Sequence, residues 1–345
     1  MAEKTSIAVR INEAVVQMSS NNQPLMDFLH AVLGKINAEG QSPNVRADLD
    51  WVRDLPLTRK RPPLGRELPQ AAINVHALGD TVGIPYVPNF PGFSVRYQDG
   101  DSLEVSGQLN YQTVWDGLRS VLGRYTPNYF PTRLMYHMLY FPAAWYLGRY
   151  LSIFWVHAGA VVRDGKALVI GGLPGCGKST LCLRMVGNGD FSLLSDDLLF
   201  YDRGQMHTCY EPVRVDDPAQ ADSEVVARMG EKSAFEVAGQ VLGSGRPEML
   251  VLPRFAETTA LQPLSSQAAA DRLYTTSRLA AQVAEFDYYA TILSSYFELD
   301  DWYPRQQQQL RQLLAEVACF SLHLSRDEGP DKAYQAVMEA ADGIF

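Results

Sequence analysis

The sequence predicts an α/β fold, with a mixed-sheet nucleotide-binding domain preceded by an α+β N-terminal region. A glycine-rich loop at 172–177 joins a strand-like run to an amphipathic helical run. Further strand-like and helical runs follow it as far as residue 341. A hairpin signal around the turn Asp99–Asp101 precedes it. We place the main boundary near residue 145, giving domains at 1–144 and 145–345.

The composition is ordinary for a globular protein. The chain has 345 residues, of which 46% are hydrophobic and 20% charged, so it can bury a core without disulfides or a structural metal. The net charge of −9 and the pI of about 5.2 argue against nucleic acid as the main partner, because binding DNA or RNA usually needs a basic surface.

The sequence also predicts a cytoplasmic protein of bacterial type. The N-terminus has no apolar run long enough for a signal peptide. The apolar segment 141–162 contains Arg149 and His157, so we interpret it as buried core and expect no membrane partner. The four cysteines form no CxxC pair, which indicates reduced thiols. Cys176 lies in the loop and is a candidate reactive thiol.

The N-terminal region is predicted from periodicity and turn residues. We expect a helix at 5–39, a linker at 40–70 rich in proline and basic residues, and a second helix at 112–150. Strands at 93–98 and 102–108 flank the turn at Asp99–Asp101. The basic run Arg59–Arg61 fits either a solvated linker or a docking site for an acidic partner.

The loop has the pattern G-x-x-x-x-G-K-[ST] that is typical of phosphate binding. Glycines let successive backbone N–H groups point at phosphate oxygens, and the helix that starts at Lys178 adds its positive end. In this pattern the lysine reaches the β- and γ-phosphates and Ser179 coordinates Mg²⁺. Pro174 has no N–H and removes one donor. The predicted ATP-binding residues are Gly172, Leu173, Pro174, Gly175, Cys176, Gly177, Lys178, Ser179 and Thr180.

Two carboxylates follow the next apolar strand. Asp196 and Asp197 end the run 191–195, which places them at the carboxyl edge of the sheet, beside the loop. One can hold Mg²⁺ and the other can deprotonate an attacking hydroxyl. A strand-to-turn junction capped by Asp is the structural alternative. His157 lies on the strand before the loop's own strand, and composition alone favours a buried core histidine there.

Together these residues resemble HPr kinase/phosphorylase and its related kinases. The resemblance rests on His157-Ala-Gly, the loop 172–180, and Leu193-Leu-Ser-Asp196-Asp197, and it covers roughly residues 145 to 345. It implies a fold shared with phosphoenolpyruvate carboxykinase. It also implies an ATP- and Mg²⁺-dependent kinase that phosphorylates a hydroxyl, a serine in that family. Assembly into homo-oligomers is a further implication.

The resemblance also implies roles for particular residues. Asp197 would be the base and Asp196 its partner at the metal, while His157 would contact phosphate or steady the Asp pair. Lys178 would draw charge from the γ-phosphoryl group. The family's Glu-x-Arg-Gly segment, whose Glu helps with Mg²⁺, is replaced by Glu211-Pro-Val-Arg214, with altered spacing and no glycine. Arg246 and Arg254 match its later basic loop only loosely. The candidate metal ligands are therefore Ser179, Asp196 and Glu211.

Two other functions stay open. Small-molecule kinases of the adenylate or adenylylsulfate kinase type carry a similar loop and a strand ending in Asp, but after Asp197 this chain continues as strands. The second alternative is a regulatory protein that binds nucleotide without phosphoryl transfer. The acceptor could be a protein, a peptide or a free metabolite, and residues 1 to 140 could recognise it or mediate assembly.

Overall fold

The computed structural model divides the chain into two compact units, each built from three segments. Unit 1 comprises Met1–Tyr150, Arg214–Phe235 and Ile292–Glu298, and unit 2 comprises Leu151–Val213, Glu236–Thr291 and Leu299–Phe345. The structure describes residues 3–52, 76–78, 80–84, 87, 93–100, 102–110, 128–215, 225–229, 232–237, 239–299 and 301–345. The predicted basic run at 59–61 and the first part of the predicted helix at 112–150 lie outside these residues.

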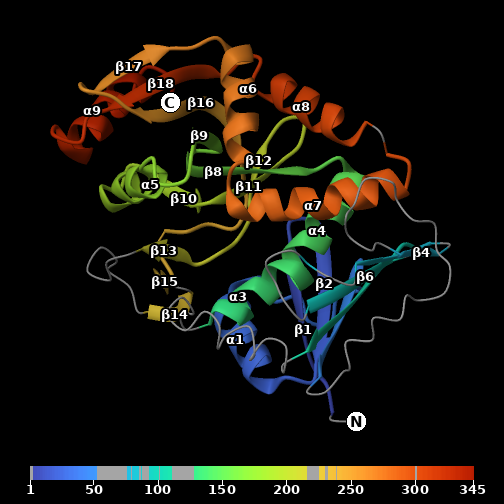
Figure 1. The fold of residues 1–345 in the computed structure, drawn as a ribbon. Helices are drawn as coiled ribbons and strands as arrows, with labels where there is room; N and C mark the ends of the chain where they lie inside the picture. The colour runs from blue at the N-terminus through green and yellow to red at the C-terminus, as the bar shows by residue number, and fades with distance from the viewer. Residues whose placement is uncertain are drawn as a thin grey trace. The chain divides into compact units, whose positions relative to one another are not determined.

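Unit 1 contains a seven-stranded mixed sheet in the order β1-β2-β3-β7-β6-β5-β4. The pairs β2–β3 and β3–β7 are parallel, and the other neighbouring strands are antiparallel. Figure 1 labels β1, β2, β4 and β6 of this sheet. The strands are β1 (Thr5–Ile11), β2 (Ala14–Ser20), β3 (Val45–Val52), β4 (His76–Leu78), β5 (Thr81–Ile84), β6 (Phe93–Gln98) and β7 (Leu103–Asn110).

The predicted helix at 5–39 is wrong. This segment forms the hairpin β1–β2 and then the helix α1 (Gln23–Leu33). The buried residues Ile7, Val9 and Ile11 recur every second position, which is a strand period. Asn12 has a φ of 55°, a left-handed conformation that asparagine tolerates in a turn. The first described helix therefore begins later, where the Asn22 side chain accepts a hydrogen bond from the Leu25 N–H.

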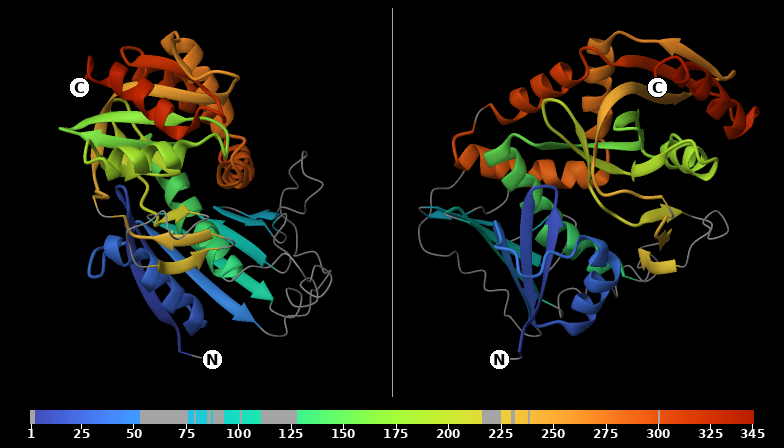
Figure 2. Two further views of the ribbon diagram at one scale, coloured as in Figure 1. Left: turned by 90° about the vertical axis from the view of Figure 1, so that its left-hand side faces the viewer. Right: turned by 180° about the vertical axis from the view of Figure 1, so that it is seen from behind.

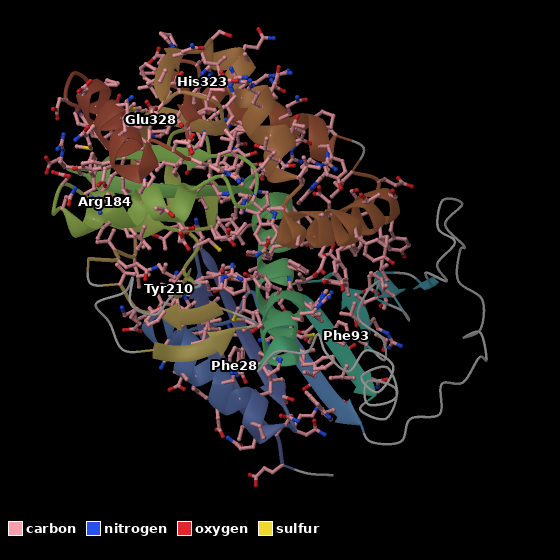
Figure 3. All side chains as sticks on the ribbon, turned by 60° about the vertical axis from the view of Figure 1, so that its left-hand side comes forward. Phe28, Phe93, Arg184, Tyr210, His323 and Glu328 are labelled. Atoms are coloured by element: carbon pink, nitrogen blue, oxygen red, sulfur yellow. The ribbon has the colours of Figure 1, made fainter. Side chains whose placement is uncertain are left out.

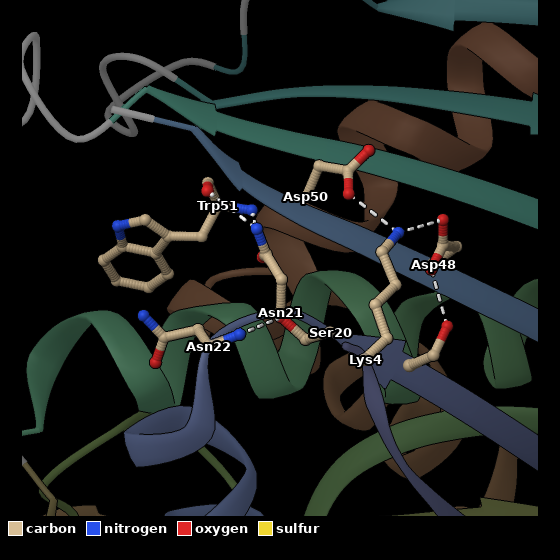
Figure 4. Close-up of polar contacts among 8 residues, drawn as sticks. Lys4, Ser20, Asn21, Asn22, Asp48, Asp50 and Trp51 are labelled. Carbon is tan, nitrogen blue, oxygen red and sulfur yellow. Dashed lines mark hydrogen bonds and ion pairs between the residues drawn. The ribbon is translucent and has the colours of Figure 1, made fainter. Parts of the chain in front are cut away.

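Polar side chains join the ends of β1, β2 and β3 (Figure 4). Lys4 pairs with Asp48 at 2.6 Å and with Asp50 at 2.7 Å. The Asn21 side chain accepts from the Trp51 N–H at 2.7 Å and donates to the Trp51 carbonyl at 3.0 Å. These contacts fix the register of β3 against the hairpin.

One helical run packs on this sheet: α3 (Tyr129–Met135), the π-helical turn η2 (Tyr136–Tyr140), α4 (Phe141–Tyr146) and the π-helical turn η3 (Leu147–Leu151). A Cβ at Gly107 would lie 2.7 Å from the Met138 sulfur, so the run lies directly on β7. The hairpin β6–β7 confirms the predicted strand pair at 93–108. A short 3₁₀ turn, η1 (Gly34–Ile36), follows α1.

A three-stranded sheet has the order β13-β15-β14. Its strands are β13 (Val213–Val215), β14 (Val225–Met229) and β15 (Lys232–Phe235).

Unit 2 is built on an eight-stranded mixed sheet. Within it β9, β16 and β18 run parallel to one another, whereas β8 is antiparallel to β9, β10 and β11. The strands are β8 (Phe154–Arg163), β9 (Lys166–Gly171), β10 (Ser192–Ser195), β11 (Leu198–Tyr201), β12 (Met206–Thr208), β16 (Ser244–Phe255), β17 (Ala260–Pro263) and β18 (Ala318–Leu324).

Helices cover both faces of this sheet. In a sheet, the side chains of two residues paired across neighbouring strands point to the same face. The side chains of successive residues in one strand point to opposite faces. A Cβ at Gly171 would meet Leu273 of α6 (Ser266–Ser277), whereas a Cβ at Gly159 would meet Cys182 of α5 (Lys178–Gly187). Gly159 pairs with Ile170, the neighbour of Gly171, so α5 and α6 lie on opposite faces.

The remaining helices of this part are α7 (Ala281–Tyr296), α8 (Trp302–Leu313) and α9 (Gly329–Ala341). α9 lies beside α5 in both views of Figure 2, and Arg184 of α5 pairs with Asp331 of α9. The apolar pattern of the sequence predicts a helix at 305–318, a strand at 319–325 and a helix at 331–341. The observed α8, β18 and α9 begin three, one and two residues earlier, and α8 ends already at Leu313.

Candidate functional site

The glycine loop and the Asp pair meet at one edge of the unit 2 sheet. β9 and β10 both run antiparallel to β8, so they run in the same direction and end at the same edge. In the register of β8, Gly171 pairs with Ala158 and Ser195 pairs with Ala160. The stretch 157–160 of β8 therefore separates the loop from the carboxylates.

The loop has the backbone that its glycines permit. Gly172, Gly175 and Gly177 have φ values of 133°, 79° and 91°, which other residues adopt only with strain. A Cβ at Gly172 would also lie 2.9 Å from the Cys176 sulfur. The Cys176 N–H donates to the Leu173 carbonyl at 3.3 Å and closes the turn. Residues 173–175 at the tip are exposed.

The helix α5 starts from this loop without a side-chain cap. Its N-cap is Gly177, which has no side chain to accept from the N–H groups of the first turn, the turn that includes Ser179 and Thr180. Lys178 is buried, and its amine donates to the Leu173 carbonyl at 3.2 Å and to the Gly172 carbonyl at 3.4 Å. A cationic amine and open N–H groups therefore face the same loop, an arrangement suited to a bound anion.

The Asp197 carboxylate is contacted through both of its oxygens. Oδ1 lies 3.1 Å from Nδ1 of His157, and Oδ2 accepts a hydrogen bond from the Gln282 amide at 3.1 Å. The Asp197 side chain is 22% exposed, whereas Asp196 is buried at 8%. Asp197 is thus the more accessible carboxylate of the pair.

The backbone of His157 is held by a hydrogen bond to α6. Its N–H donates to the Ser277 hydroxyl of α6 at 2.7 Å. Its ring is buried. Nδ1 lies close to Asp197 without the geometry of a hydrogen bond, and Nε2 has no hydrogen-bond partner within the described part of the chain. Buried polar atoms are rarely left unsatisfied, so this nitrogen indicates a place for a bound polar group.

The pKa values of two buried thiols, Cys209 and Cys182, show which charged side chains lie near them. Burial raises the pKa of Cys209, and the charges of Glu211 and Asp197 raise it further. Burial also raises the pKa of Cys182, with Asp196 adding to the rise and Lys178 opposing it. Glu211 is itself buried. Glu211 and Asp197 therefore lie near Cys209, and Asp196 and Lys178 lie near Cys182.

All four cysteines are buried and free of disulfides, in line with the predicted reduced thiols. Burial raises the pKa of Cys176 above its ordinary value, although Lys178 opposes this rise. The thiol therefore stays protonated near neutral pH, which argues against the reactive thiol considered from the sequence.

The two arginines named from the sequence lie at opposite ends of β16. Arg246 pairs with Lys166, the first residue of β9, and forms an ion pair with Glu248. Arg254 lies at the carboxyl end, next to Pro253, whose carbonyl would be 3.5 Å from a Cβ at Gly172. Only Arg254 therefore reaches the edge that carries the loop.

Sequence reasoning missed Gln282 and Ser277. Both lie more than 75 residues after the Asp pair, at the junction of α6 and α7, and no local pattern marks them. Only the packing of α6 on β8 reveals their contacts with the site.

No cluster of three or more His, Cys, Asp or Glu side chains suited to a metal occurs in the described residues. The same residues include no helix with the length and apolarity needed to cross a bilayer. The apolar segment 141–162 forms α4, η3 and most of β8.

Comparisons with known proteins give little beyond this geometry. No family model matches the sequence, and no curated protein matches it. Among solved structures, the HPr(Ser) kinase/phosphatase from Coxiella burnetii matches with a TM-score of 0.27 and 10% identity, over 54% of this chain and 95% of that chain. This is a weak structural relation.

Proposed function

We propose that this chain is a Mg²⁺-dependent phosphotransferase that moves the γ-phosphoryl group of ATP to a hydroxyl group. The observation that carries the proposal is the strand register, which brings the loop with Lys178 and the Asp197 carboxylate to one sheet edge, on either side of β8. A phosphate site and a base are the two parts that such a transfer requires.

The loop would hold the phosphates of ATP. Backbone N–H groups of the loop and of the first turn of α5 would donate to phosphate oxygens. The Lys178 amine now contacts two neutral carbonyls. Anionic phosphate oxygens are stronger acceptors, so the amine would turn to them when nucleotide binds. Nε2 of His157 would be available to a bound phosphate or to the acceptor.

Asp197 would act as the general base. As the acceptor oxygen bonds to the γ-phosphorus, its proton passes to the Asp197 carboxylate and the bond from phosphorus to the β,γ-bridging oxygen breaks, so that ADP leaves. His157 and Gln282 contact different oxygens of this carboxylate and fix its orientation. Catalysis would then depend mainly on positioning and charge.

Ser179, Asp196 and Glu211 would hold the Mg²⁺ ion. A hydroxyl and two carboxylates are hard oxygen donors of the kind that Mg²⁺ prefers. Asp196 and Glu211 are both buried, and a cation there would offset the cost of burying their charges. When bound, the ion would neutralise negative charge on the phosphates.

The acceptor would be a serine of a protein or peptide, or a hydroxyl of a small molecule. After Asp197 the chain enters the strand β11, where small-molecule kinases of the adenylate kinase type continue into a helix. This favours the group that phosphorylates serine. The proposed oligomerisation rests on the resemblance. Residues 1 to 140 would recognise the acceptor or mediate assembly.

The test is transfer from γ-labelled ATP with Mg²⁺, using the purified chain alone and then with lysate of its host. We expect a labelled acceptor with the wild type and a loss of roughly 10²- to 10⁴-fold with Asp197→Asn, the range for removing a general base. The affinity for the non-hydrolysable analogue AMP-PNP should stay within about threefold, because Asp197 is not a loop residue.

Asp202→Asn is a matched control. Asp202 also lies beside a histidine, with His207 at 3.0 Å, but on the turn between β11 and β12. Replacing the Asp202 carboxylate should leave the rate of phosphoryl transfer unchanged. Tight AMP-PNP binding without any transfer would contradict the phosphotransferase and favour a nucleotide-binding regulatory protein.

A further inference from the structure

Two arginines and a histidine gather beside the phosphate-binding loop. Arg254 of β16 and His323 of β18 are register partners, and their side chains meet with Nη2 2.6 Å from Nε2. Arg272 of α6 acts on the same imidazole through its charge. His323 is labelled in Figure 3. Arg254, Arg272 and His323 are called the edge cluster below.

Each member of the edge cluster is the chain neighbour of a residue packed on the loop or on the end of β9 that leads into it. Leu273, next to Arg272, would lie 2.4 Å from a Cβ at Gly171. Leu324, next to His323, would lie 3.8 Å from a Cβ at Gly177. Pro253, next to Arg254, approaches Gly172 as described above. The cluster therefore lies at the same sheet edge as the loop.

The edge cluster points to the α6 face. Leu252, two residues before Arg254, would lie 2.9 Å from a Cβ at Gly171, the atom position that also meets α6. Residues two apart on a strand share a face, so Arg254 and its partner His323 point towards α6. The helix α5, which follows the loop, lies on the other face. The cluster is thus separate from the groups that would hold the nucleotide phosphates.

The charges of the edge cluster are not offset by the protein. Within the described residues, neither Arg254 nor Arg272 forms an ion pair, and both are exposed. Other arginines in the described part of this acidic chain do pair with carboxylates, among them Arg46, Arg149, Arg184, Arg246, Arg278, Arg305 and Arg311. On β17 the register partner of His323 is the uncharged Ala260.

Positive side chains that lie close together without carboxylate partners favour the binding of an anion. Partial burial lowers the pKa of His323, and the charges of Arg254 and Arg272 lower it further. The neutral imidazole accepts a hydrogen bond from Arg254 at Nε2, which leaves its proton on Nδ1 as a donor. Two guanidinium groups and one N–H donor match the oxygens of a phosphate or a carboxylate.

We infer that the edge cluster binds an anionic group, phosphate or carboxylate, of the phosphoryl acceptor. This inference rests on the proposed function, because the loop with Lys178 is assigned to the nucleotide. The acceptor would accordingly carry a negative charge near the hydroxyl that receives the phosphoryl group. The anion would come from the acceptor or from the nucleotide itself, and the experiment below separates these two sources.

The probe is inorganic phosphate, and the readout is the pKa of His323 from NMR of its ring protons, assigned with His323→Gln. A bound anion favours the charged imidazole, so phosphate should raise this pKa by about 1. We expect the rise in the free protein and equally in protein saturated with Mg²⁺ and AMP-PNP, whose binding is measured separately by calorimetry.

The double variant R254Q/R272Q should remove the rise caused by phosphate and keep AMP-PNP affinity. Arg326→Gln is the matched control, because Arg326 is an exposed arginine at the same edge that lies over the Phe255 ring at 4.5 Å. It should retain the rise. Removing mutual repulsion should leave the melting temperature of the double variant unchanged or higher.

Three outcomes would overturn the inference. Phosphate that leaves the His323 pKa unchanged in the wild type removes the anion site. A rise that disappears once AMP-PNP is bound assigns the site to the nucleotide. If calorimetry shows that the protein binds no AMP-PNP, the proposed function is wrong. The assignment of the edge cluster to the acceptor is then wrong as well.

Discussion

At the scale of single residues, the site depends on how one carboxylate is held. Asp197 contacts a histidine from β8 and an amide from α7, one at each oxygen. An amide N–H stabilises the ionised carboxylate and fixes its plane, so Gln282 is a positioning residue for the proposed base. The same reasoning does not apply to Asp196, which is more deeply buried and is assigned to the metal.

We predict that Gln282→Glu shifts the acidic limb of the pH–activity profile to higher pH by about 1 or more, because a second carboxylate beside Asp197 raises its pKa. Activity needs the ionised base, so it would be lost at a higher pH as the solution is acidified. Gln282→Leu, which only removes the donor, should lower kcat about tenfold with little change in KM for ATP. Unchanged pH profiles in both variants would mean that Gln282 has only a structural role.

At the scale of elements, two glycines allow helices to pack closely on the strands of the site. Gly159 on β8 faces Cys182 of α5, and Gly171 on β9 faces Leu273 of α6. A Cβ at Gly159 would lie 2.8 Å from the Cys182 sulfur and 3.1 Å from the Asp196 carbonyl. The second contact is with backbone, which cannot rotate away. A side chain at position 159 would therefore press on both α5 and the backbone of Asp196.

We predict that Gly159→Ala lowers the free energy of unfolding by roughly 1–3 kcal/mol, the usual cost of overpacking a core. It should also reduce transfer, because Asp196 must move. Urea denaturation measures the first effect. Gly187→Ala, at the end of α5, is the control: nothing lies within 4 Å of its Cβ position, so stability should change by less than about 0.5 kcal/mol. Equal stability of the wild type and Gly159→Ala would show that α5 adapts without cost.

At the scale of the whole molecule, the two units are interleaved along the chain. Segments near residues 214–235 and 292–298 belong to unit 1, although they are flanked by unit 2. The helix α7 begins in unit 2, where Gln282 contacts Asp197, and its last residues belong to unit 1. All residues of the proposed nucleotide site belong to unit 2.

We predict that Mg²⁺ with AMP-PNP at 100 times its Kd stabilises the protein that binds it by about 2.7 kcal/mol. The melting temperature should rise by several degrees, and hydrogen exchange should slow in β9, α5 and the Asp pair rather than in the unit 1 sheet. Lys178→Ala should abolish both effects. Slower exchange confined to unit 1 would place the nucleotide elsewhere.

Local interactions determined what the sequence alone could predict. The loop after β9 follows from glycines, a preceding apolar strand and a following helix, all within residues 166–187. The β6–β7 hairpin follows from alternation around a short turn. The N-terminal hairpin was mistaken for a helix because a mixed set of apolar residues fits both periods, and the turn at Asn12 decides between them.

Only the tertiary structure decided which distant side chains meet. The contacts of Asp197 with His157 and Gln282 depend on the register of β8 with β11 and on the packing of α6 and α7. The edge cluster likewise needs the parallel pairing of β16 with β18, which lie more than 60 residues apart. Such pairings are selected by burial of whole strands and helices, so no local pattern of residues encodes them.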